Sequence, residues 1–130
     1  METKECDKKK LILIVDDEEQ IVLLLKTILN VYGFDSISSL SPKGIVDFAA
    51  KENPDLIILD IAMPEIDGYQ ICRSVKSDER TQHIPIVMIT ALALAQDRKL
   101  ALDSGADGFI LKPFDPRDVI AEIERLTPQA

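Results

Sequence analysis

Short segments that are apolar at nearly every position alternate along this chain with segments in which apolar residues recur every three or four positions. The clearest short segment is LILIV at residues 11–15. A run of this kind predicts a strand that is buried on both faces, which is typical of a parallel sheet covered by helices on each side. The segment that follows has apolar residues at helical spacing from Ile21 to Leu29, and Gly33 then predicts the end of a helix.

The alternation occurs five times and predicts an α/β fold with right-handed crossover connections. The Ser41-Pro42 and Asp115-Pro116 pairs each combine a capping side chain with a proline at the first helical position. The expected strands are residues 11–15, 34–38, 56–59, 84–89 and 108–111. The expected helices are residues 21–32, 41–51, 69–76, about 93–104 and 115–126.

Length and charge limit the classes of protein to consider. A chain of 130 residues suits one domain and can bury enough surface to fold without a disulfide or a structural metal. Its 23 acidic and 15 basic residues give a net charge of −8. Because a nucleic-acid backbone attracts clusters of Lys and Arg, we expect no direct contact with nucleic acid.

The two cysteines and the N-terminus indicate the compartment. Cys6 and Cys72 form no metal-binding or redox motif, and such isolated cysteines are typical of a reducing environment. Cys72 is expected in the core. The first ten residues lack the apolar segment of a signal peptide, and no apolar run is long enough to cross a bilayer. We therefore expect a cytoplasmic protein without a membrane partner.

Polar residues follow the expected strands, at the edge of an open parallel sheet where ligands bind. Asp16 and Asp17 follow the first strand, Asp60 the third, Thr90 the fourth and Lys112 the fifth. Asp16 and Asp17 alone could simply cap the next helix, because an acid at a helix start accepts hydrogen bonds from free N–H groups. Asp60 is harder to explain in this way, since Pro64 and Gly68 predict a loop after it.

Three neighbouring carboxylates would be unfavourable unless a proton or a cation neutralises them. Mg²⁺ is the natural cation, because it prefers oxygen ligands and bridges carboxylates to phosphates. With the Lys112 ammonium and the Thr90 hydroxyl, such a site could hold a phosphoryl group. No Ser or Cys is placed as a nucleophile, so the Asp60 carboxylate is the candidate to attack phosphorus.

Four sequence pieces resemble the receiver domain of two-component response regulators. They are VDDE at 15–18, LDIAMPEIDG at 59–68, ITA at 89–91 and GADGFILKPF at 105–114, and the likeness covers about residues 10–127. No single piece is specific, but all four occur in the family's order on βα units. The resemblance implies a flavodoxin-like (βα)5 doubly wound sheet with strand order 2-1-3-4-5. We expect the receiver domain at residues 11–127, between a disordered N-terminal tail at 1–10, which is polar, and a short C-terminal tail at 128–130.

The resemblance also assigns roles to the site residues. Asp60 would accept a phosphoryl group from the phosphohistidine of a histidine kinase or a phosphotransfer protein. Mg²⁺ would be bound by Asp17, Asp60 and the backbone carbonyl of Ala62, and by Asp16 through water. Lys112 would pair with Asp60 and later with the phosphate, and the Lys112–Pro113 peptide would be cis.

Thr90 and Phe109 resemble the family's switch pair, in which the hydroxyl moves toward the phosphate and the ring turns inward. Phe109 stands where the family commonly has Tyr, so the inward state would rest on packing alone. The face of the fourth helix, fifth strand and fifth helix would then change for an effector protein or a tethered output domain, or for a homodimer that forms on phosphorylation. The chain would not be an enzyme beyond its own phosphorylation and dephosphorylation.

Two variable positions flank the expected site. Ala62 follows Asp60 by two residues, and Leu92 follows Thr90 by two. In the family such positions tune how fast water removes the phosphate. Neither side chain can orient a water molecule, so we expect a fairly long-lived aspartyl phosphate. His83, in a polar segment, is expected to be a solvated loop residue rather than a phosphodonor.

Three alternatives remain at this point. A haloacid-dehalogenase-like phosphatase also uses an aspartyl phosphate, but it needs an acid two residues after the nucleophile; Asp16 has Glu18 there, whereas Asp60 has Ala62. A flavin carrier of the same fold would place its phosphate against three acids. A degenerate receiver would serve only as an interaction surface, although here all five key residues are present.

Overall fold

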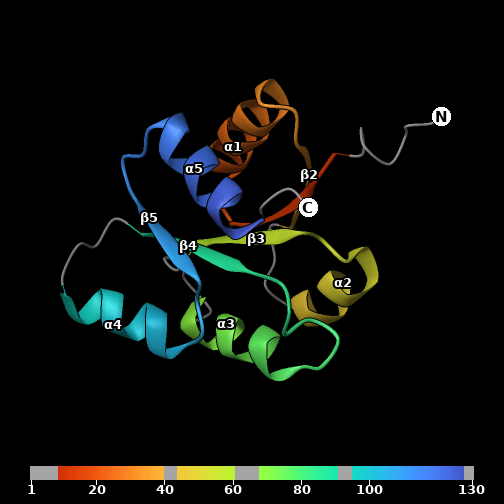
Figure 1. Cartoon of the computed structure of the whole chain (residues 1–130), viewed down its shortest axis with the longest axis vertical. Coiled ribbons are helices and arrows are strands. Elements are labelled where there is room, and N and C mark those ends of the chain that lie inside the picture. Colours follow the sequence, from red (N-terminus) through yellow and green to blue (C-terminus); the bar gives the residue numbers. More distant parts are fainter. Residues whose placement is uncertain (1–8, 40–43, 61–67, 91–94, 128–130) are drawn as a thin grey trace.

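One parallel sheet lies between two layers of helices (Figure 1). The computed structural model describes residues 9–39, 44–60, 68–90 and 95–127, with only the backbone of residues 95–98. The strand order is β2-β1-β3-β4-β5, which confirms the expected flavodoxin-like topology. The strands are β1 (Leu11–Val15), β2 (Asp35–Ser39), β3 (Leu56–Asp60), β4 (Ile86–Thr90) and β5 (Gly108–Leu111).

The helices divide between the two faces of the sheet. Helices α1 (Glu19–Val31) and α5 (Pro116–Leu126) cover one face. Helices α2 (Ile45–Glu52), α3 (Gly68–Ser77) and α4 (Ala95–Asp103) cover the other (Figure 1). None of these helices has both the length and the apolar composition that a bilayer span needs.

The core consists of two apolar clusters, one on each face of the sheet. Alternate residues of a strand point to opposite faces, so Leu13 joins the cluster under α2 and α3, whereas Ile12 and Ile14 join the cluster under α1 and α5. Strands β3 and β4 are buried at every residue, as their continuous apolar sequences predict. Cys72 lies in the core as expected, with no exposed surface.

Several element boundaries differ from the expected ones by one to four residues, and two of these differences have a clear local cause. Strand β4 begins at Ile86 rather than Ile84, because Pro85 has no N–H and the Ile84 N–H bonds to the carbonyl of Thr81 instead. Helix α2 begins at Ile45, after Gly44 with a φ of 70°, which is a left-handed conformation that ends any helix on its N-terminal side. The expected start at Ser41-Pro42 lies outside the described residues.

The predicted cap of the last helix is confirmed. Asp115 is the N-cap of α5, its side chain accepts a hydrogen bond from the Arg117 N–H at 2.8 Å, and Pro116 is the first helical residue. The buried face of α5 consists of Val119, Ile120 and Ile123. This helix therefore packs against the sheet beside the end of β5.

Candidate phosphoacceptor site

The pairing of β1 with β3 brings two acidic residues side by side at the carboxyl edge of the sheet. Val15 pairs with Leu59, so the residues that follow them, Asp16 and Asp60, lie next to each other at this edge. Both residues are only 1% exposed. Asp60 in turn pairs with Ile89, which places Thr90 just beyond it on β4. Strand order thus gathers residues that lie far apart in the sequence.

Asp16, Asp17 and Asp60 form an acidic cluster. Each residue offers one carboxylate oxygen, and these oxygens lie within 4.8 Å of one another. Asp16 and Asp60 are buried, whereas Asp17 is exposed at the mouth of the site. In octahedral Mg²⁺ coordination, opposite ligands are separated by about 4.2 Å, so only a small movement would let these oxygens share one ion.

The hydrogen bonds of Asp16 support the metal site over a capping role. Its Oδ1 accepts a bond from the Glu18 N–H at 2.9 Å, but its buried Oδ2 has no hydrogen-bond partner among the described residues. The N-cap residue of α1 is Glu18, whose side chain makes no capping bond. Neither Asp16 nor Asp17 is the N-cap. An unpartnered buried carboxylate oxygen beside two other carboxylates fits a cation or a cation-bound water.

The environment of Asp16 resists ionisation. The pKa of Asp16 is raised to about 7, chiefly by burial, although the hydrogen bond from the Glu18 N–H opposes the rise. The negative charge of Asp60, and a hydrogen bond that a protonated Asp16 could donate to it, also contribute to the raised pKa, whereas the positive charge of Lys112 acts to lower it. Without a cation, a proton would therefore partly neutralise this cluster at neutral pH.

Lys112 supplies the positive charge of the site. It follows β5, its backbone N–H bonds to the Thr90 carbonyl at 2.8 Å, and its Nζ donates a hydrogen bond to Asp60 Oδ2 at 3.1 Å. Its side chain is 21% exposed. The Lys112–Pro113 peptide is cis, as the family resemblance implied.

Thr90 and Phe109 lie near each other on neighbouring strands. Thr90 is the last residue of β4 and is 5% exposed, so its hydroxyl group lies at the same sheet edge as Asp60. Phe109 pairs with Met88, is partly buried, and packs against the same apolar cluster under α2 and α3 that Leu13 joins. Ala62 and Leu92, expected to flank the site, lie outside the described residues. His83 is exposed in a turn, in keeping with a solvated loop residue.

One neighbour of the site was missed from sequence. Glu18 Oε1 lies 3.8 Å from Lys112 Nζ, so Lys112 is shared between buried Asp60 and exposed Glu18. The signal was available, because Glu18 follows Asp17 directly in the acidic run DDEE. A sequence cannot show, however, which of two adjacent acids turns toward a lysine on another strand.

Comparison with known proteins decides the family. The model of the family described as "Response regulator receiver domain" matches residues 12–124. This chain is a response regulator receiver domain. The match includes residues of all five strands of the sheet and the whole acidic cluster. Neither the fold nor the family match supports the haloacid-dehalogenase alternative.

Relatives agree with this assignment. The DNA-binding dual master transcriptional regulator RpaA of Synechocystis is 38% identical over 103 residues, which are 79% of this chain and 43% of RpaA. The chain spans less than half of the length of the curated relatives that it matches.

Solved receiver domains have the same fold. The signal receiver domain of a histidine kinase from Syntrophus aciditrophicus is 36% identical, with a TM-score of 0.82 and coverage of 91% of this chain and 89% of that one. The receiver domain of a sensor histidine kinase from Pseudomonas aeruginosa is 25% identical, with a TM-score of 0.84 and coverage of 94% and 100%. That structure has a magnesium ion coordinated in its active-site cleft.

Proposed function

We propose that Asp60 of this receiver accepts a phosphoryl group from the phosphohistidine of a histidine kinase or a phosphotransfer protein. The observation that carries the proposal is the position of Asp60 at the end of a central strand, 1% exposed and hydrogen-bonded by Lys112 at 3.1 Å. Asp60 is a buried acid that pairs with a lysine and lies beside two further acids. Such an arrangement would let its carboxylate react with an incoming phosphoryl group while the lysine then pairs with the phosphate. Family membership supports this role, because receivers act in phosphorelay signalling.

In the proposed step, an Asp60 carboxylate oxygen forms a bond to phosphorus while the P–N bond to the donor imidazole breaks. The electron pair of the P–N bond stays on the imidazole nitrogen, which then takes up a proton. Lys112 stays beside the transferred group and stabilises its negative oxygens, since its Nζ already lies against Asp60. The acyl phosphate is hydrolysed later by water, so the domain acts on itself and is not a turnover enzyme.

The proposed metal ligands are Asp17, Asp60 and the backbone carbonyl of Ala62, with Asp16 reaching the ion through water. A bound Mg²⁺ would supply charge neutralisation for the phosphoryl oxygens. The donor set suits a hard cation, because the cluster offers carboxylate oxygens and one of them, Asp16 Oδ2, is buried without a hydrogen-bond partner among the described residues. The magnesium-bound receiver from Pseudomonas aeruginosa supports this choice by similarity.

Output would follow from a shift between two conformations. Thr90 would move toward the phosphate, and Phe109 would turn inward behind it. The face formed by α4, β5 and α5 would then present a different surface to an effector protein or an output domain. The name of RpaA suggests DNA-binding output in that relative, of which this chain matches only 43%. We place the domain in the cytoplasm, with homodimerisation as another form of output.

Intact-protein mass spectrometry after incubation with acetyl phosphate and Mg²⁺ tests the phosphoacceptor. The wild-type protein is expected to gain one phosphoryl group, and Asp60→Asn is expected to gain none. Asp35→Asn, which changes an exposed acid on the far edge strand β2, is the matched control and should behave as wild type. Labelling that persists in Asp60→Asn would assign the acceptor to another residue.

A second measurement separates signalling from hydrolysis. A receiver is expected to show no sustained turnover of p-nitrophenyl phosphate. Continuous release of p-nitrophenol that disappears in Asp60→Asn would favour the phosphatase alternative instead.

A further inference from the structure

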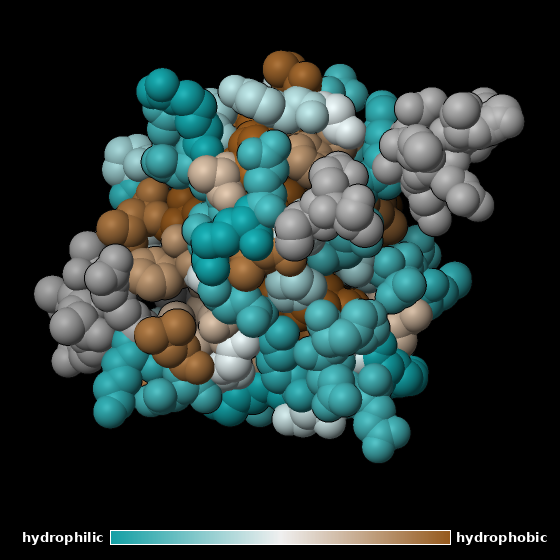
Figure 2. Space-filling view, viewed as in Figure 1, coloured by the Kyte–Doolittle hydropathy of each residue, from teal (hydrophilic) through white to brown (hydrophobic). Residues whose placement is uncertain are grey.

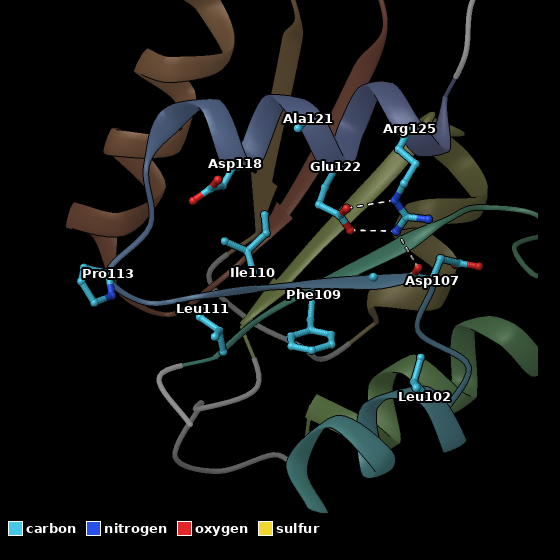
Figure 3. A pocket seen from close by; sticks show the side chains of 11 residues that line it. Leu102, Asp107, Phe109, Ile110, Leu111, Pro113, Asp118, Ala121, Glu122 and Arg125 are labelled. Atoms are coloured by element: carbon cyan, nitrogen blue, oxygen red, sulfur yellow. Dashed lines mark hydrogen bonds and ion pairs between the residues drawn. The ribbon is translucent and has the colours of Figure 1, made fainter. Parts of the chain in front are cut away.

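The residues in and around β5 serve two different parts of the domain. A groove of about 590 Å³ follows this strand between α4 and α5 (Figure 3), and every residue from Asp107 to Pro113 lines it except Lys112. Figure 2, viewed as in Figure 1, shows hydrophobic surface on its left side, where β5 and α4 lie. This groove belongs to the face already proposed for output. Lys112 differs from its neighbours because its side chain is directed to the acidic edge of the sheet.

The ammonium group of Lys112 lies between two carboxylates that differ in their exposure to solvent. Its Nζ is 3.1 Å from Asp60 Oδ2 and 3.8 Å from Glu18 Oε1. The side chain of Asp60 is 1% exposed, that of Lys112 is 21% exposed and that of Glu18 is 62% exposed. The lysine therefore connects the interior of the site with its mouth, and a short movement of its ammonium group would exchange the buried partner for the solvated one.

The backbone of Glu18 is fixed although its side chain is exposed. Its N–H donates to Asp16 Oδ1 at 2.9 Å, and its carbonyl accepts hydrogen bonds from the N–H groups of Ile21 and Val22, each at 3.1 Å. Glu18 is the N-cap of α1, but its side chain makes no capping bond. A Ser, Thr, Asp or Asn at this position would usually satisfy a free N–H of the helix. The Glu18 carboxylate is instead placed beside Lys112.

A cation at the acidic cluster would disturb the pair of Lys112 and Asp60. One carboxylate oxygen each of Asp16, Asp17 and Asp60 lies within 4.8 Å of the others, and the lysine ammonium lies against one of these three residues. A divalent cation that joins the cluster repels this ammonium. Glu18 offers the ammonium a second carboxylate on the solvent side, so the lysine can yield to the cation and keep a negative partner.

We propose that Glu18 is a positioning residue that takes over the Lys112 ammonium when a cation binds the acidic cluster. Held by Glu18, the ammonium stays at the mouth of the site, where the oxygens of an incoming phosphoryl group arrive. Glu18 thus lowers the free-energy cost of cation binding by acting on Lys112, and it is not itself a metal ligand. This inference rests on the proposed function, because it concerns the proposed Mg²⁺ site and the lysine that stabilises the transferred group.

Nuclear magnetic resonance of the lysine side-chain nitrogens in the whole protein tests the contact. The Lys112 signal is assigned by its loss in Lys112→Met. Without metal, Glu18→Gln is expected to shift this signal more than Glu19→Gln, which removes the same charge from the exposed residue that follows. With Mg²⁺, the signal should persist in the wild type but be broadened in Glu18→Gln, because an unpaired ammonium exchanges its protons with water faster. Equal behaviour of the two variants would overturn the positioning role.

A double-mutant cycle on Mg²⁺ affinity, measured by isothermal titration calorimetry, separates this role from simple attraction of the cation. Glu18→Gln should raise the Mg²⁺ dissociation constant about threefold, as expected for one exposed charge pair, and Glu19→Gln should raise it less. In a Lys112→Met background, Glu18→Gln should have no larger effect than Glu19→Gln. If Glu18 attracted the cation directly, its effect would persist or grow without the lysine, and that result would overturn the inference.

Glu18→Asp keeps the charge but shortens the side chain, so it should weaken Mg²⁺ binding nearly as much as Glu18→Gln does. Wild-type affinity in Glu18→Asp would mean that charge alone is sufficient, which would also overturn the inference.

Failure of the proposed function gives a different result from failure of this inference. Absence of Mg²⁺ binding to the wild type would overturn the proposed metal site and this inference with it. Mg²⁺ binding in which Glu18 and Lys112 act independently would overturn only the inference. Phosphorylation of Asp60 is scored separately by intact mass, so its failure would remove the proposed acceptor and leave the relation between Glu18 and Lys112 in place.

Discussion

Lys112 Nζ lies 3.1 Å from Asp60 Oδ2, although the two residues leave strands β5 and β3, which β4 separates in the sheet. The long lysine side chain spans this gap because Lys112 stays hydrogen-bonded through its backbone to Thr90 at the end of β4. Lys112 thus forms an ion pair with buried Asp60, whereas the Oδ2 oxygen of the neighbouring Asp16 has no hydrogen-bond partner among the residues that the structure describes.

Removal of the lysine charge should strengthen cation binding. Lys112 lies against one of the three carboxylates of the acidic cluster, so its ammonium group repels a divalent cation there. Lys112→Met is expected to lower the Mg²⁺ dissociation constant by about fivefold in isothermal titration calorimetry. Lys51→Met, at the end of α2, is the control and should leave the constant unchanged. Weaker Mg²⁺ binding in Lys112→Met would mean that the lysine helps to build the metal site.

Because the pKa of Asp16 is raised, we expect the free energies of unfolding of wild type and Asp16→Asn to differ by an amount that depends on pH. The carboxyl has a pKa of about 7 in the folded protein and of 3.8 as its ordinary value, so between these values the folded state binds more protons than the unfolded state. In Mg²⁺-free buffer, the contribution of Asp16 to the free energy of unfolding of the wild type should therefore decrease as pH rises from about 4 to about 7. Asp16→Asn does not titrate.

The free energy of unfolding of Asp16→Asn minus that of wild type should thus increase between pH 4 and pH 8, by up to about 4 kcal/mol. Urea denaturation followed by circular dichroism at several pH values measures it. Asp35→Asn should show no such trend. Added Mg²⁺ should shrink the difference at pH 8, because a cation removes the repulsion that Asp16 experiences. A difference that is flat with pH would contradict the raised pKa.

The close packing of Glu122 and Arg125 against Gly108 predicts that the effects of Gly108→Ala and Glu122→Ala on stability are not additive. A Cβ at this position would lie 2.1 Å from Glu122 Oε2 and 2.8 Å from Arg125 Nη2, so Gly108→Ala must displace that surface ion pair. The expected loss of stability is about 1 kcal/mol, because an exposed ion pair contributes little and flexible side chains can move. In a Glu122→Ala background, Gly108→Ala should be neutral or slightly stabilising, since alanine is more favourable in a strand than glycine is. Equal effects in both backgrounds, measured by urea denaturation, would show that the ion pair does not restrict residue 108.

The residues beside the acceptor predict a stable phosphorylated form. Neither Ala62 nor Leu92 can orient an attacking water, so radiolabel on Asp60 is expected to outlast several minutes in Mg²⁺ buffer. Ala62→Glu should accelerate the loss of label, because a carboxylate can position a water and accept its proton. A wild-type lifetime of seconds would show that some other group orients the water.

Much of the fold followed from local sequence patterns. The all-apolar runs at β1 and β3 predicted buried parallel strands, because only a sheet covered on both faces can bury every side chain of such a run. The cap of α5 was equally local, since Asp115 and Pro116 act on the first turn of their own helix. The start of β4 was predicted wrongly because a single hydrogen bond decides it: the Ile84 N–H donates to the Thr81 carbonyl instead of joining the sheet.

The sequence by itself determined which residues end the strands, and so which side chains share the carboxyl edge: Asp16, Asp60, Thr90 and Lys112. Strand order was implied by the family resemblance and not by periodicity, because the spacing of apolar residues does not indicate which strands pair with each other. Only the tertiary structure decided that Lys112 is shared by Asp60 and Glu18, that Asp16 Oδ2 has no hydrogen-bond partner within the described ranges, and that a groove follows β5. These features depend on contacts between segments that are distant in the sequence, and such contacts are fixed only when the helices pack on the sheet.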